Sequence, residues 1–186
     1  MTDGPALVWG DSALLVAIPE AEPVVGPVRL RHDVVASRGI PAHVTVLFPF
    51  VPATEIDSSM HGTLRKLFGS LGGFEYRFER VDRFGATTVF LAPEPARSFS
   101  ALTEAVVRRW PEYPPYGGAF AEVIPHMTVG DELADGVADR VSGEVVELLA
   151  SHGPVTGRAT EVLLMTEGGA GRWSVKARYP LAAARS

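Results

Sequence analysis

The sequence predicts an α+β fold with two lobes, in which two antiparallel sheets carry helices on their outer faces and enclose a central cleft. The main observation is a duplication: one short motif occurs twice, 83 residues apart, and both copies lie in the same order of strand and helix patterns. The chain also has 186 residues, 46% of them hydrophobic, and no cysteine, so it can bury a core without disulfides or zinc–thiolate sites. We therefore expect residues 1–186 to form a single domain with two pseudo-symmetric lobes.

The first third of the chain predicts two strands, each followed by a helix. Residues 13–20 form an apolar run stopped by a proline, which is typical of a buried strand, and residues 24–37 carry a weak helical pattern. Residues 40–50 are rich in β-branched and aromatic side chains and predict the second strand. Thr54, with Asp57 three residues later, predicts the N-cap of the next helix.

The middle of the chain predicts a hairpin, a helix and a loop. Apolar and charged residues alternate over 74–84, the period of a half-buried strand, and Gly85 turns this strand into a second one at 87–93. Residues 98–110 have apolar side chains at helical spacing. Residues 111–118 are rich in proline and glycine and therefore predict a loop.

The last third predicts a strand, a helix and a second hairpin. Residues 124–130 have the pattern of a strand, and residues 133–150 place one apolar stripe along a helix. Two further strands are expected at 155–167 and 172–181, joined by a glycine-rich turn at 168–171.

The duplicated motif is a histidine and a threonine separated by one hydrophobic residue. Side chains two apart on a strand share a face and lie about 6.6 Å apart. His43 should therefore lie beside Thr45, and His126 beside Thr128. A two-fold axis between the lobes would make the two pairs face each other across the cleft. The matching segments are Ile40-Pro41-Ala42-His43-Val44-Thr45-Val46 and Ile124-Pro125-His126-Met127-Thr128-Val129.

Two imidazoles and two hydroxyls around one point suit phosphoryl chemistry. Attack at phosphorus needs a base on the nucleophile and an acid on the leaving oxygen, and two histidines near their ordinary pKa of about 6.5 can divide these roles. Threonine hydroxyls can donate to the non-bridging phosphate oxygens. This arrangement requires no metal, and we expect no cofactor. The sequence does not say which histidine is the base.

His43-Val44-Thr45-Val46 and His126-Met127-Thr128-Val129 resemble the paired signatures of the 2H phosphoesterase superfamily. That superfamily includes the bacterial 2′-5′ RNA ligase-like proteins and the RNA cyclic phosphodiesterases, and the stretch PAHVTVLFPF is especially similar to the ligase-like branch. The resemblance implies a bilobal α+β fold, a metal-independent mechanism, and His43, Thr45, His126 and Thr128 as the catalytic residues.

Four further residues are candidates for binding the substrate. Tyr116 lies in the loop before His126 and could stack on a base, or could anchor the loop by packing on its prolines. Phe90 and Trp173 are also 83 residues apart, and paired aromatics of this kind serve either a pocket or a core. Arg83 precedes a turn and could contact a phosphate.

His32 and Asp33 form the dipeptide found in metal-dependent phosphohydrolases. They lie on the weak helix without partner ligands, so we expect a solvated surface pair and no metal site. If turnover required magnesium or manganese, this pair would be the candidate site.

The net charge of the chain excludes some classes of binding partner. The chain has 22 acidic and 17 basic residues, a net charge of −5, which argues against a protein that coats DNA or long RNA. The N-terminal MTDGPALVWGDS has no basic stretch before an apolar core, so we expect a cytoplasmic protein without a membrane segment. The resemblance implies a hydrolase of RNA processing, and we expect it to be a monomer. Its expected substrate is a 2′,3′-cyclic phosphate or 2′-5′ phosphodiester in a small nucleotide or RNA terminus. The alternative is a non-catalytic module that binds a nucleotide or phosphate in the same cleft.

Overall fold

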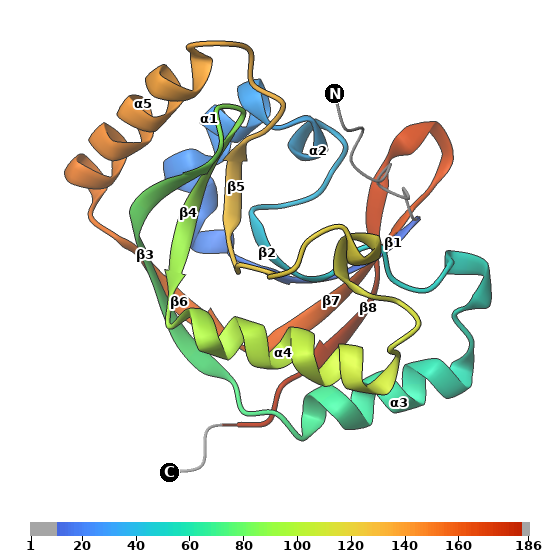
Figure 1. Cartoon of the computed structure of the whole chain (residues 1–186). Coiled ribbons are helices and arrows are strands. Elements are labelled where there is room, and N and C mark those ends of the chain that lie inside the picture. The colour runs from blue at the N-terminus through green and yellow to red at the C-terminus, as the bar shows by residue number, and fades with distance from the viewer. Residues whose placement is uncertain (1–10, 184–186) are drawn as a thin grey trace.

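The computed structural model describes residues 11–183, which form eight strands and five α-helices (Figure 1). The strands are β1 (Ser12–Ala17), β2 (His43–Leu47), β3 (Phe74–Phe84), β4 (Thr88–Glu94), β5 (Met127–Gly130), β6 (Val155–Ala159), β7 (Glu161–Glu167) and β8 (Trp173–Pro180). The helices are α1 (Glu22–His32), α2 (Val34–Ser37), α3 (Ser58–Gly69), α4 (Ala96–Arg109) and α5 (Val137–His152). Most of the N-terminal segment in which the sequence predicts no targeting signal lies outside the described residues.

The strands form two four-stranded antiparallel sheets with the spatial orders β2-β1-β7-β8 and β5-β4-β3-β6. This arrangement confirms the predicted α+β class and its two antiparallel sheets. Each motif strand lies at the edge of its sheet and pairs with the strand that precedes it in the chain, β2 with β1 and β5 with β4. Leu15 lies opposite Thr45 in the first pair, and Phe90 lies opposite Thr128 in the second. The two halves therefore repeat one local arrangement.

The predicted equivalence of Phe90 and Trp173 is wrong. Phe90 lies on β4 beside a motif strand, so its counterpart in the first sheet is Leu15 on β1. Trp173 instead begins the edge strand β8, opposite Glu167. Equal separation along the chain therefore does not give equal positions in the fold.

The single strand predicted over residues 155–167 is divided at Thr160. Its first part, β6, pairs with β3 in the second sheet, and its second part, β7, pairs with β1 in the first sheet. No glycine, proline, asparagine or aspartate marks the division, where the sequence reads Ala159-Thr160-Glu161. Strand periodicity alone could not show that the chain changes sheets here.

One predicted helix is broken, and another begins at a different residue from the one predicted. The helix predicted over residues 24–37 is broken at Asp33, which has an extended backbone and whose side chain accepts a hydrogen bond from the Val35 amide at the start of α2. The N-cap of α3 is Asp57, whose carboxylate accepts from the Met60 amide at 2.8 Å. Thr54, the expected cap, lies in a short 3₁₀ turn before it.

One apolar cluster joins the two sheets and the helices around them. It contains side chains from both sheets and from α1, α3, α4 and α5. Helices α1 and α5 pack on strands of the second sheet, whereas α4 packs on β2 and α3 on β8 of the first (Figure 1). Within residues 11–183, no helix combines the length and apolar character needed to cross a bilayer.

Candidate functional site

The four motif side chains lie on the partly exposed faces of β2 and β5. His43 begins β2, whereas His126 lies just before β5 rather than inside the predicted strand. The two motif strands contact each other although they belong to different sheets (Figure 1). The alternating residues are buried, as the two-residue period predicts: Val44, Val46, Met127 and Val129.

Both imidazoles are held in the same way. The Nδ1 atom of His43 lies 2.8 Å from the carbonyl oxygen of Pro41, and the Nδ1 atom of His126 lies 2.7 Å from that of Ile124. A carbonyl oxygen only accepts, so each Nδ1 carries a proton and donates. In a neutral ring this leaves the lone pair on Nε2, which can accept a proton from a substrate or water.

The surroundings keep both histidines neutral at pH 7, to different degrees. Burial lowers the pKa of His43 to about 3, and the charges of Arg29 and His126 add to this effect. Burial also lowers the pKa of His126, but the bond to Ile124 and the negative charge of Asp131 oppose that shift. Of the two, His126 has the negatively charged neighbour that favours its imidazolium.

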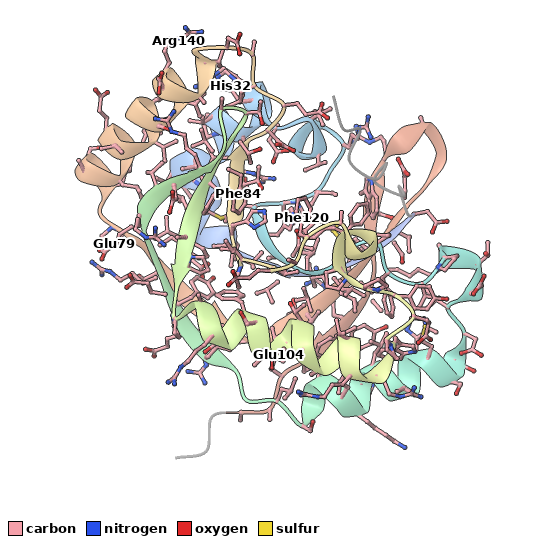
Figure 2. All side chains as sticks on the ribbon, viewed as in Figure 1. His32, Glu79, Phe84, Glu104, Phe120 and Arg140 are labelled. Atoms are coloured by element: carbon pink, nitrogen blue, oxygen red, sulfur yellow. The ribbon has the colours of Figure 1, made fainter. Side chains whose placement is uncertain are left out.

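A pocket of about 370 Å³ lies against the second motif and includes His126 and Thr128 in its lining. Phe84 meets the His126 ring edge to face, with centroids 4.9 Å apart, and Phe120 comes from the loop across the pocket (Figure 2). Among the described residues, the lining also contains the carboxylates of Glu122 and Asp131 and no lysine or arginine. The pocket therefore offers aromatic surface and hydrogen-bond acceptors beside the second imidazole.

Tyr116 connects the pocket to the first motif. Its backbone φ of 52° is in the left-handed region, which is strained for a tyrosine, and its amide donates to the carbonyl oxygen of Phe48 at 2.6 Å. Its side chain makes a hydrogen bond with Thr45 and also lines the pocket beside His126. Burial raises the pKa of the Tyr116 hydroxyl, so this group is a neutral donor and acceptor at pH 7.

Two of the other predicted substrate-binding residues, Phe90 and Trp173, serve as aromatic packing. Phe90 is only 3% exposed and stacks on Phe84 with ring centroids 4.3 Å apart, so it supports the pocket wall from behind. Trp173 packs edge to face on Phe48 and on the apolar cluster around Leu15.

The structure does not bring Arg83 into the site. Arg83 lies opposite the buried Val89, which directs its side chain to the sheet face away from Phe84. Its Nη1 donates to the Oδ1 of Asp139 on α5 at 2.6 Å.

Among the lining residues that sequence reasoning missed are Phe84, Thr88, Phe120 and Asp131. Asp131 has a signal in the sequence, because a carboxylate directly after the strand that follows His126 is a natural partner for an imidazolium. Thr88 donates to the Oδ1 of Asp131 at 2.7 Å and so helps to fix that carboxylate. The other two have no local signal, since only the tertiary structure brings their segments together.

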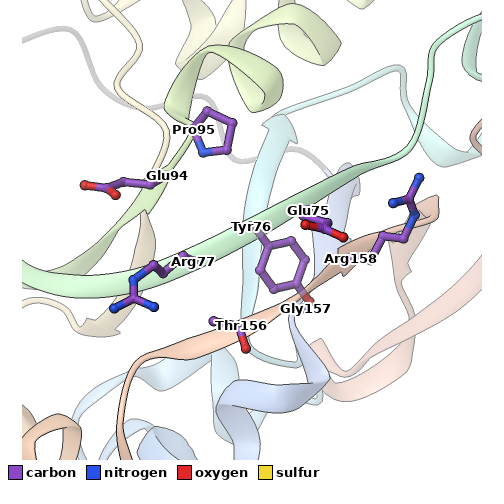
Figure 3. Close-up of a pocket in the computed structure, with 8 residues that line it drawn as sticks. All are labelled: Glu75, Tyr76, Arg77, Glu94, Pro95, Thr156, Gly157 and Arg158. Carbon is purple, nitrogen blue, oxygen red and sulfur yellow. The ribbon is translucent and has the colours of Figure 1, made fainter. Parts of the chain in front are cut away.

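A larger hollow, of about 970 Å³, lies over β3 and β6 and contains neither motif (Figure 3). Arg77 and Arg158 flank it together with Glu75 and Glu94. Tyr76 points toward β6, and its hydroxyl donates to the carboxylate of Glu20. No group of three or more histidine, aspartate or glutamate side chains within residues 11–183 is arranged to hold a metal ion. The motif pocket is smaller, but it contains His126 and Thr128 of the second motif, and it is therefore the candidate site. His43 and Thr45 are not part of its lining, and Tyr116, which contacts Thr45, connects them to it.

A family profile described as the 2′-5′ RNA ligase superfamily matches residues 18–170, a span that includes both motifs. The structure is similar to that of TT0787 of Thermus thermophilus, with a TM-score of 0.59 and 17% identity over 94% of this chain and 100% of that one. It is also similar to a protein described as a phosphoesterase, with a TM-score of 0.55 and 16% identity over 93% of this chain and 99% of that one.

A third similar structure is E. coli LigT complexed with NADP⁺, with a TM-score of 0.54 and 15% identity over 92% of this chain and 98% of that one. At these identities the three likenesses show a shared fold. No curated protein sequence matches the chain.

Proposed function

The chain belongs to the 2′-5′ RNA ligase superfamily of 2H phosphoesterases, and we propose that it is a metal-independent phosphoesterase. Its proposed substrate is a 2′,3′-cyclic phosphate or a 2′-5′ phosphodiester, in a small nucleotide or at an RNA end. The observation that carries this proposal is the matched pair of His43 and His126. Each donates from Nδ1 to a backbone carbonyl. His43 begins β2 and His126 directly precedes β5, and these two strands are in contact. A neutral imidazole fixed in this way is suited to exchange a proton at Nε2.

We assign the base role to His43 and the acid role to His126. The lowered pKa keeps His43 unprotonated, so its Nε2 lone pair is available to accept a proton from water, whose oxygen then bonds to phosphorus. A bound phosphate anion would raise the pKa of His43 and so strengthen it as a base. The bond from phosphorus to one ribose oxygen breaks, and that oxygen takes the proton of His126, whose imidazolium Asp131 favours. The hydroxyls of Thr45 and Thr128 would donate to the non-bridging oxygens.

A turnover panel tests this proposal directly. The panel contains the four 2′,3′-cyclic mononucleotides, 2′-5′-linked dinucleotides and short RNAs with a 2′,3′-cyclic phosphate end, each with and without a chelator. We expect hydrolysis of at least one member and no loss of rate with chelator. Binding of these compounds without turnover would overturn the enzyme assignment in favour of a nucleotide-binding module, and a rate restored only by added magnesium or manganese would overturn metal independence.

The pocket lining predicts a weak dependence on salt. Apart from the histidine, the charged side chains that the described residues place in this lining are the carboxylates Glu122 and Asp131, so few cationic contacts to further phosphates are available. Each phosphate contact on a single strand would add a log–log slope of about −0.7. We expect KM to vary little with salt, and equally little for a cyclic mononucleotide and for a longer RNA with the same end. A steep slope with much tighter binding of the long RNA would contradict this interpretation of the pocket.

The pH profile should depend on Asp131. In the free enzyme His126 must be protonated and His43 neutral, so kcat/KM should fall on the alkaline side with the pKa of His126, which lies below its ordinary 6.5. Replacing Asp131 with asparagine removes the negative charge that raises this pKa, so the alkaline fall should move to lower pH. The control is Asp139→Asn on α5, an exposed carboxylate paired with Arg83. A shift of the Asp131→Asn profile to higher pH would contradict the role assignment.

A further inference from the structure

Arg29 on α1 is a fully buried arginine, with 1% of its surface exposed, and its guanidinium reaches the backbone of the second motif. Its Nε donates to the carbonyl oxygen of Thr128 at 3.1 Å. Its Nη2 donates to the Oδ2 of Asp33 at 2.8 Å. The burial of a charge in this way is costly unless partners hold it, and Asp33 is such a partner.

The same guanidinium is linked to the first motif. Its Nη1 lies 3.8 Å from the Oε1 of Glu22, and that oxygen accepts a hydrogen bond from the amide of Ala42 at 2.6 Å. Ala42 directly precedes His43 in the chain. One side chain of α1 therefore lies between the backbone next to His43 and the backbone of Thr128.

The expectation of a solvated His32–Asp33 surface pair is wrong for Asp33. Asp33 is 3% exposed, and both its carboxylate oxygens have partners: Oδ2 accepts from Arg29, and Oδ1 accepts from the Val35 amide at 3.3 Å. Asp33 lies at the break between α1 and α2, and its ion pair with Arg29 holds the guanidinium beside β5. The carboxylate belongs to an ion pair and is not free to bind a metal.

Among the described residues, no backbone hydrogen bonds of a sheet join the motif strands, so their relative position depends on side-chain packing and on polar contacts such as those of Arg29. The strands β2 and β5 are edge strands of different sheets, and no strand pairing within residues 11–183 joins them. Their relative position sets the separation of His43 and His126. A displacement of about 1 Å between reacting groups can lower a rate roughly 100-fold.

We propose that Arg29, held by Asp33 and Glu22, is a positioning residue that fixes the two motif strands relative to each other. This inference rests on the proposed two-histidine function. An arginine suits the task because its planar fork can donate from Nε and Nη2 in two fixed directions at once. A lysine offers one ammonium on a flexible stem and cannot reproduce both bonds.

The charge of Arg29 has a second consequence at His43. The charges that face this imidazole are those of Arg29 and of protonated His126, which both oppose its protonation, while its bond to the Pro41 carbonyl favours it. Removing the guanidinium should therefore raise the pKa of His43. This effect can be measured without any substrate.

The test compares Arg29→Lys and Asp33→Asn with Arg31→Lys, a matched control on the same helix. Arg31 is exposed and pairs with Glu144 on α5, away from both motifs. We expect kcat to fall roughly 10-fold to 100-fold in Arg29→Lys and Asp33→Asn, with KM changed less than about three-fold. Arg31→Lys should keep the wild-type kcat. Folded Arg29→Lys and Asp33→Asn proteins with unchanged kcat would overturn the proposal.

A titration of the histidine ring signals by NMR separates this inference from the proposed function. The pKa of His43 should rise in Arg29→Met, and the ring signals of both His43 and His126 should shift in Arg29→Lys, which serves where Arg29→Met does not fold. If the wild-type protein turns over no member of the panel, the proposed function fails. The titration still tests whether Arg29 positions the two histidine rings. Ring signals and pKa values identical to wild type in the folded variants would overturn the positioning role of Arg29.

Discussion

Replacing His43 or His126 with alanine should lower kcat by roughly 10²–10⁴, the scale expected when an acid or base is lost. Each alanine removes one Nε2 that the proposed reaction requires, while the other imidazole keeps its anchor to the backbone carbonyl. The double variant should lose far less than the product of the two single losses, because the residues act as a unit. Single-turnover rates on the best substrate of the panel measure these effects.

The control for this prediction is His152→Ala. His152 is exposed at the end of α5, where its ring contacts Ser151 and a backbone carbonyl, so kcat should be unchanged. Thermal unfolding of the His43 and His126 variants should stay close to wild type, since both side chains are partly exposed and neither belongs to the apolar core. Turnover that survives both alanine substitutions within a few-fold would refute the two-histidine mechanism.

Replacing Phe99 with alanine should destabilise the protein by about 3–5 kcal/mol, as expected for a large cavity in a packed core. Phe99 on α4 is 1% exposed and contacts three aromatic rings of β3, the nearest being Phe74 with centroids 4.9 Å apart. The substitution removes the main aromatic contact between α4 and that sheet. The free energy of unfolding, measured in urea, reports the loss.

The matched control is Phe120→Ala, which removes the same side chain from an exposed position. Phe120 is 57% exposed and contacts the Tyr116 ring on the pocket loop. Its removal should change the free energy of unfolding by less than about 1 kcal/mol. Equal losses in the two variants would show that the contacts of Phe99 do not carry the stability assigned to them.

The two motifs could be found from the sequence because their information is local. A histidine and a threonine two residues apart on a strand must share a face, and the burial of Val44 and Val46 follows from the same period. The repetition of the motif also indicates that two such strands occur. None of this depends on knowing which elements lie side by side.

Other features of the site depend on contacts across the fold, and local patterns do not contain them. The alternation along β3 leaves the direction of Arg83 undecided, and only the pairing with Val89 settles it. An aspartate and an arginine one helical turn apart are expected to form a solvated pair on a helix surface. Only the fold shows that Arg29 and Asp33 are both buried. The division at Thr160 is hidden because no turn-forming residue marks it, since the residues on either side are Ala159 and Glu161.

The halves of this chain exchange elements. The strand β3, from the first half, completes the sheet that contains β5, and β7 and β8 return from the C-terminal end to complete the sheet that contains β2. Helices follow the same exchange, since α1 packs on β5 and α4 packs on β2. β1 must pair with β7 across most of the chain before the first sheet closes. Pairings between segments so far apart in the chain slow folding, because the entropy of closing long loops is lost before the strand contacts form.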